Sequence, residues 1–142
     1  MFDAEAASFV CEFIECLTCS NGAPFRLMDW QRDAVTEFYG QMIEAEGNEA
    51  DPMGNYIRRY QYLYLEIAKK NGKSELAAAL GVYHLYADGE VNGEVYVVAA
   101  DRDNAGIVYS AAKWMVEHST ALMKRISRAR ASGGTATRRS TT

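Results

Sequence analysis

Apolar residues recur at helical spacing in four stretches of this chain and run almost without interruption in two others. The two continuous runs, at 60–67 and 94–101, are rich in tyrosine, valine and leucine, which is typical of strands buried on both faces of a parallel sheet. The helical stretches predict helices over residues 3–18, from an expected cap at Asp29 onward, over 74–86 and over 104–117. The order strand, helix, strand, helix then predicts parallel strands joined by a right-handed crossover.

These elements fit one domain with a helical start. We expect a helical lead-in over 1–43, a solvated loop rich in acidic residues and glycine over 44–55, and a β-α-β-α core over 56–126. Residues 127–142 lack periodicity and apolar content, which predicts a disordered basic tail. The fold class is therefore α/β: a parallel sheet with flanking helices, incomplete because only two strong strand signals exist.

The most informative motif lies between the first predicted strand and the third predicted helix. Gly72, Lys73 and Ser74 follow the strand and open the helix, which is the layout of a phosphate-binding loop. Backbone N–H groups from Asn71 to Ser74 would cradle a phosphate, Lys73 would reach the β- and γ-phosphates, and the Ser74 hydroxyl would bind Mg²⁺. The full pattern places its first glycine at a position that here is Ile67. The alternative reading is a left-handed turn followed by an exposed lysine.

Charge is distributed unevenly along the chain. Residues 124–142 hold six basic and no acidic residues, which leaves nine basic and 19 acidic residues elsewhere, a net charge of about −10. An acidic body argues against broad nonspecific DNA binding by this part of the protein. No apolar run is long enough to cross a bilayer, and the first residues lack the basic start of a secretory signal, so we expect a cytoplasmic protein without membrane contact.

The three cysteines do not predict a metal site. Cys11, Cys16 and Cys19 have the spacing that opens one type of iron–sulfur site, but no fourth thiolate follows. They lie among apolar residues at helical spacing, which favours reduced, partly buried thiols. The isolated His84 is expected to be a packing or surface group, and Asp88 with the glycine after it is expected to end the third helix.

Three blocks together carry a resemblance to a known family: LMDWQ at 27–31, AKKNGKS at 68–74 and VVAADRDNA at 97–105. In this order and spacing they resemble the start of the tailed-phage terminase large subunit, over about residues 5–125. The resemblance implies a P-loop NTPase-like fold in an ATP-driven motor that moves phage DNA into a procapsid and cuts it with a separate C-terminal nuclease domain.

The resemblance also implies roles for individual residues. Gln31 would read the adenine edge, because a carboxamide both donates and accepts hydrogen bonds. Lys69 would contact the phosphates where the family usually has arginine, which can bind a phosphate with two parallel hydrogen bonds. ATP and Mg²⁺ are the implied cofactors. Phage DNA, the terminase small subunit and the portal protein are the implied partners, in the cytoplasm of a bacterial host, and self-association is a further expectation.

Two departures from the family limit the expected activity. No apolar strand ending in an Asp-Glu pair follows the loop, and no nuclease carboxylate cluster is present, so we expect ATP binding with poor hydrolysis. One alternative is a small-molecule P-loop kinase that uses Asp101 and Asp103 to bind Mg²⁺ and a substrate hydroxyl. Another is a noncatalytic fragment that interacts with a partner.

Overall fold

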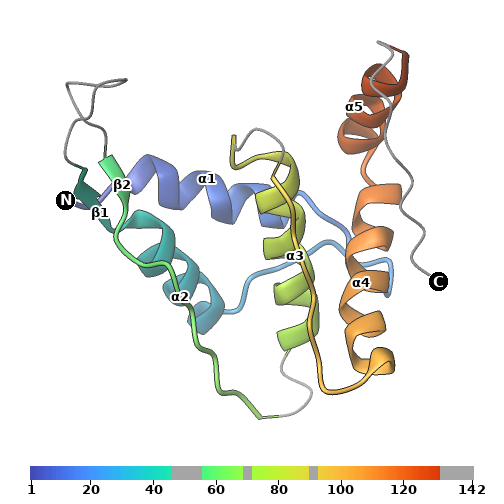
Figure 1. Cartoon of the computed structure of the whole chain (residues 1–142), viewed down its shortest axis with the longest axis horizontal. Helices are drawn as coiled ribbons and strands as arrows, with labels where there is room; N and C mark the ends of the chain where they lie inside the picture. Colours follow the sequence, from blue (N-terminus) through green and yellow to red (C-terminus); the bar gives the residue numbers. More distant parts are fainter. Residues whose placement is uncertain (46–55, 69–71, 90–92, 132–142) are drawn as a thin grey trace.

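The computed structural model of the chain describes residues 1–45, 56–68, 72–89 and 93–131. Helix α3 lies between α1 and α4, and α2 packs chiefly on α1 (Figure 1). The elements are α1 (Ala4–Glu15), α2 (Asp29–Gly40), β1 (Met42–Glu44), β2 (Tyr56–Arg58), α3 (Lys73–Tyr86), α4 (Arg102–Glu117) and α5 (Thr120–Ala131). The four helices expected from the spacing of apolar residues are therefore present.

Local hydrogen bonds fix where the helices begin. Asp3 caps α1 by accepting a hydrogen bond from the Ala6 N–H at 2.9 Å, which satisfies one of the donors that a helix start leaves unpaired. Helix α2 differs from the expectation, because Asp29 is its first residue and Met28 is its cap. The Gln31 side chain folds back instead, and its Oε1 accepts the Met28 N–H at 3.0 Å.

The core is formed where α1, α2, α3 and α4 meet. Its most deeply buried side chains include Ile14, Val35, Leu76 and Met115, each at most 1% exposed. Burying one such side chain contributes about 1.5–3 kcal/mol to folding. Small residues on α3, such as Ala79, let neighbouring helices approach closely. The core therefore fixes α3, the helix that carries the Gly-Lys-Ser motif at its start.

The sheet of this structure is small and antiparallel. Strand β1 pairs with β2 in the register Met42↔Arg58 to Glu44↔Tyr56, so the segment expected to be a loop is flanked by two short strands. Residues 46–55, which make up most of that expected loop, lie outside the described residues. Gly40, shortly before β1, packs on the ring of Phe2. A β-carbon at residue 40 would stand 2.2 Å from this ring, so a larger residue would clash with it.

The expected parallel sheet is not shown by the described part of the chain. Segments 60–68 and 93–100 run extended, the first past α2 and the second across α3, and neither takes part in a sheet ladder (Figure 1). A strand needs a neighbouring strand to pair its backbone groups, and no described strand lies beside either segment. The fold is thus mixed helix and strand, with both predicted strands lacking strand partners.

Neither extended segment is buried on both of its apolar faces. On the first, Leu65 packs against the core while Tyr62 is 90% exposed and Tyr64 is 84% exposed. On the second, Val95 reaches α3 at Gly81, whereas Val98 is 90% exposed. The continuous apolar sequences predicted burial on both faces, so the outward faces form an exposed apolar surface.

Helix α5 was not foreseen by the sequence pattern. It buries Leu122, and Arg125 donates a hydrogen bond to the carbonyl oxygen of Tyr86 at the end of α3. The helix continues to Ala131, beyond the point at which a disordered tail was expected to begin, and residues 132–142 lie outside the described residues. Within the described ranges, every helix is too short or too polar to cross a bilayer.

We expect the exposed outward faces to drive self-association. Replacing Tyr62 and Val98 together with lysine should shift the purified chain toward monomer in light scattering, because charge on an exposed strand opposes edge-to-edge pairing. The matched control is Tyr109→Lys, which changes an exposed aromatic residue on α4. A wild-type chain that is already a monodisperse monomer would contradict this prediction.

Candidate functional site

The candidate site is built around the backbone of Gly72, which is the N-terminal cap of α3. Gly72 has φ +75° and ψ 16°, in the left-handed region that glycine adopts without steric cost. The helix then begins at Lys73, and Gly72 has no side chain with which to cap the first N–H groups of α3. By contrast, the side chains of Asp3, Gln31 and Asp101 bond to backbone N–H groups at the starts of α1, α2 and α4.

Gln31 lies directly against this glycine, although 41 residues separate the two in sequence. Its Nε2 atom is 3.2 Å from the position where a β-carbon would stand at residue 72, and Cε of Met28 is 3.4 Å from the same point. Gln31 is 2% exposed and is the buried polar residue of the described core. The structure thus places Gln31, which is predicted to read adenine, against Gly72, which is predicted to bind phosphate.

The remaining predicted site residues fall into two groups. Lys73 is exposed in the first turn of α3, and the partly buried Ser74 follows it. Lys69 and Asn71 lie outside the described residues, so their expected contacts with phosphate stay predictions. The N-terminus of a helix favours negative charge, because its peptide dipoles align and its first N–H groups have no partner within the helix.

A cleft of about 730 Å³ opens beside Ser74, between the first turn of α3 and the side of α4 that runs from Arg102 to Trp114. Glu75, Asp103 and Trp114 also line it. Among the described residues, Glu75 Oε2 and Trp114 Nε1 are buried and have no hydrogen-bond partner, so one acceptor and one donor of the cleft lining stay unsatisfied. Sequence reasoning missed Glu75, because an acidic residue in the first turn of a helix is usually explained by the helix dipole alone.

Glu75 connects the start of α3 to the turn that follows α1. Ser20 donates a hydrogen bond from its hydroxyl to Glu75 Oε1. Burial, and then the negative charge of Glu75, raise the pKa of the Cys19 thiol, so this cysteine favours the neutral form. All three cysteines are free, and the described residues contain no group of histidine, cysteine and carboxylate side chains able to hold a metal ion. Cys11 is buried and Cys19 is partly buried, as expected, whereas Cys16 is exposed.

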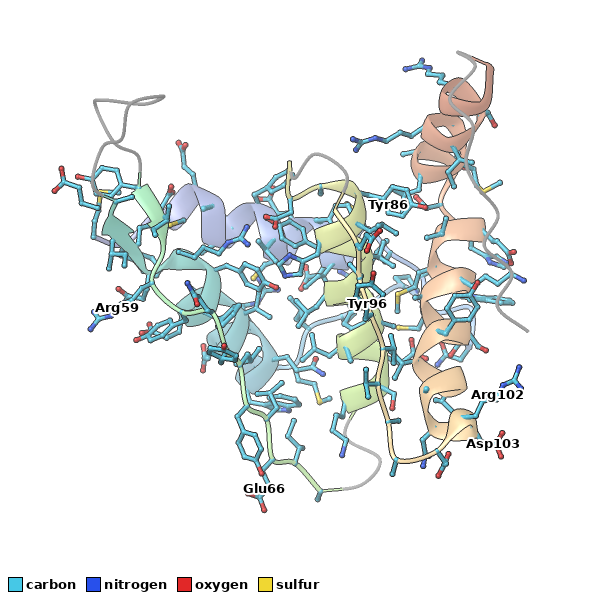
Figure 2. All side chains as sticks on the ribbon, viewed as in Figure 1. Arg59, Glu66, Tyr86, Tyr96, Arg102 and Asp103 are labelled. Atoms are coloured by element: carbon cyan, nitrogen blue, oxygen red, sulfur yellow. The ribbon has the colours of Figure 1, made fainter. Side chains whose placement is uncertain are left out.

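The two acidic residues of the kinase alternative have different surroundings. Asp101 is the cap of α4: its Oδ1 accepts the Asn104 N–H at 2.8 Å and its Oδ2 accepts the Asn104 side-chain amide at 2.7 Å. Both oxygens of Asp101 are therefore used in starting a helix. Asp103 is exposed beside Arg102 at the first turn of α4 (Figure 2). Helix capping thus accounts for Asp101, whereas Asp103 lines the cleft beside Ser74.

We expect Gly72→Ala to destabilise the chain more than Gly22→Ala. Both glycines have positive φ, at +75° and +84°, and alanine in this region costs about 1–2 kcal/mol. A β-carbon at Gly22 would meet nothing within 4 Å, whereas one at Gly72 would press on Gln31 and Met28. Urea unfolding of the two variants measures the difference, and equal losses would show that Gln31 is not held against the loop.

Comparison with known families gave a match over more than half of the chain. The family model of the terminase large subunit ATPase domain matches residues 52–139, which is more than half of the chain. The matched range contains the Gly72–Ser74 segment, α3, α4 and α5, while α1, α2 and Gln31 precede it. Neither the search of curated proteins nor that of solved structures gave a match. On the strength of the family match, the chain belongs to the terminase large subunit ATPase domain family.

Proposed function

We propose that this chain binds ATP at the start of α3, as part of a motor that uses ATP to package phage DNA. The observation that carries the proposal is the placement of Gln31 against Gly72 at a glycine-capped helix start. One residue suited to a purine base and a backbone suited to phosphate meet there, in a chain of the terminase ATPase family.

The residues present fit a magnesium nucleotide. The N–H groups at the start of α3 would hold the phosphates, and Lys73 is exposed where its ammonium group can reach them. Ser74 lines the adjacent cleft, where its hydroxyl would bind the Mg²⁺ carried by the nucleotide. Lys69 and Asn71 would add donors from the loop before Gly72. When bound, the Mg²⁺ nucleotide supplies the phosphoanhydride bond whose hydrolysis drives the motor.

Gln31 would orient the base with the amide atoms that remain available after its hydrogen bond to Met28. Its Oε1 already accepts the Met28 N–H, and a carbonyl oxygen can accept a second hydrogen bond. Its Nε2 lies on the side of Gly72, where it can donate to a ring nitrogen. Because the side chain is buried and held at one end, a base would meet a group whose rotamer is already fixed.

We propose nucleotide binding with little turnover for this chain. Positioning of the attacking water in such ATPases depends on a carboxylate, and no apolar strand ending in Asp-Glu occurs in the sequence. Transport of phage DNA, and work with the terminase small subunit and portal protein in the host cytoplasm, are proposals that follow from family membership.

A second candidate function is an interaction module. The exposed outward faces of residues 60–67 and 93–100 favour it, because extended apolar segments that join no sheet within the described part of the chain offer a surface for a partner strand. The two functions are compatible, since α3 and its start are formed while these faces remain uncovered.

We expect Lys73→Ala to abolish Mg²⁺-dependent ATP binding measured by titration calorimetry. The change removes the charge that would face the β- and γ-phosphates. Lys113→Ala is the matched control, because Lys113 is an exposed lysine on α4 whose partner is Glu117 at 3.8 Å. It should leave the affinity unchanged.

Equal ATP affinity in the wild type and in Lys73→Ala would contradict the proposed site. Circular dichroism melting of both variants ensures that a loss of binding is not a loss of folding. Since Lys73 is exposed, its replacement should change the free energy of unfolding by less than about 0.5 kcal/mol.

A further inference from the structure

The two parts of the candidate site lie at the starts of two helices that touch each other little. Gln31 is in the first turn of α2, and Gly72 is the cap of α3. Helix α2 packs mainly on α1, and α3 packs mainly on α4, so direct packing between α2 and α3 is sparse. The distance between Gln31 and Gly72 therefore depends on the packing of both helices on α1 and on the few side chains that join α2 to α3 directly.

A buried cluster joins the same two helices near their other ends. We call Tyr39, Arg58, Tyr83, His84 and Asp88 the polar clamp. The Tyr39 hydroxyl lies 2.7 Å from Nε2 of His84, which links α2 to α3 directly. The Tyr39 ring, which is 2% exposed, also meets the edge of the Tyr83 ring at a centroid distance of 5.4 Å. This link is about 12 Å along α2 from Gln31.

Asp88 is the hub of the polar clamp. Arg58 of β2 donates to both carboxylate oxygens of Asp88, with Nη1 3.1 Å from Oδ2. Nδ1 of His84 lies 3.0 Å from Oδ2, and the Tyr83 hydroxyl lies 3.4 Å from Oδ1. Only 8% of the Asp88 side chain is exposed. The carboxylate is thus surrounded by donors from two elements.

The protonation states in the clamp agree with these hydrogen bonds. Burial acts to raise the pKa of Asp88, but the hydrogen bonds from Arg58 and His84, together with the charge of Arg58, outweigh it and hold that pKa below its ordinary value. Burial raises the pKa of Tyr39, so the phenol keeps its proton. A carboxylate can only accept, so His84 donates from Nδ1, and its Nε2 can accept the Tyr39 proton. Each group in the chain Asp88, His84, Tyr39 therefore has a matching partner.

Arg58 adds a second connection from β2 to α2. Its guanidinium carbon lies 5.0 Å from the centre of the Tyr39 ring, within the range of a cation–π contact. Arg59, the next residue, points to the outside of the molecule (Figure 2) and packs over Tyr60 instead. Of these two adjacent arginines, therefore, only Arg58 belongs to the polar clamp.

We propose that the polar clamp positions Gln31 for recognition of the adenine base. This inference rests on the proposed nucleotide site and names its positioning residues. If α2 turned by about 10° around the Tyr39 link, Gln31 would move by about 2 Å, which exceeds the tolerance of a hydrogen bond. The proposed phosphate contacts come from the start of α3, which packs chiefly on α4, a helix that contributes no residue to the clamp. Loss of the clamp should therefore remove base discrimination and spare phosphate binding.

The test compares three ligands in the full chain: Mg²⁺-ATP, Mg²⁺-GTP and Mg²⁺-tripolyphosphate. The variants are Asp88→Asn, which removes the charge of the hub, and Tyr39→Phe, which removes one hydroxyl group. Arg59→Gln is the matched control. We expect the wild type to bind ATP more tightly than GTP. In both variants ATP affinity should fall about tenfold, to the level of GTP, as expected for one lost hydrogen-bonded contact. The affinities for GTP and tripolyphosphate should stay within about twofold.

Other results would overturn the inference. Retained preference for ATP in both folded variants would show that the clamp does not position Gln31, and so would an equal loss for all three ligands. If Asp88→Asn does not fold, Tyr39→Phe decides alone, since its ring and packing are unchanged. A wild type that binds none of the ligands would overturn the proposed function itself, and this inference with it.

Discussion

The left-handed backbone of Gly72 is the constraint on which the candidate site depends. It allows the chain to begin α3 without a capping side chain, which leaves the first N–H groups of the helix for an anion. The missing β-carbon also leaves room for Gln31, whose Nε2 lies 3.2 Å from the point where a β-carbon would stand. One glycine therefore satisfies both a backbone requirement and a packing requirement.

The helices were predictable because their signals are local. The 3.6-residue spacing of apolar residues predicted α1 to α4. The observed bounds of these helices differ from the predicted bounds by only a few residues. Strands β1 and β2 were not foreseen, since each has three residues and is defined by pairing with a distant segment. Helix α5 was missed because its arginines suggested disorder, whereas Leu122 and the Arg125 bond to Tyr86 attach it to the core. Within the described residues the two predicted strands are extended and join no sheet, because a sheet needs neighbouring strands that a single segment cannot supply.

The candidate site was predictable to a similar extent. The phosphate-binding loop at 72–74 was predicted because strand-forming residues precede it and helix-forming residues follow it. Gln31 followed only from family resemblance, since a glutamine early in a helix is ordinary. The polar clamp was not foreseen: Asp88 was explained as a helix end and His84 as a packing group. Their roles arise from Tyr39 and Arg58, which are distant in sequence and meet them only in the folded chain.

The most direct measurement is a titration of the ¹⁵N-labelled chain with Mg²⁺-ADP, followed by nuclear magnetic resonance. Two signals matter: the backbone amide of Gly72 and the side-chain amide of Gln31, which lie side by side at the start of α3. We expect both to shift with the same dissociation constant, while amides of α5 remain unchanged. A shift at Gly72 without one at Gln31, or shifts confined to other parts of the chain, would contradict a nucleotide site shared by α2 and α3.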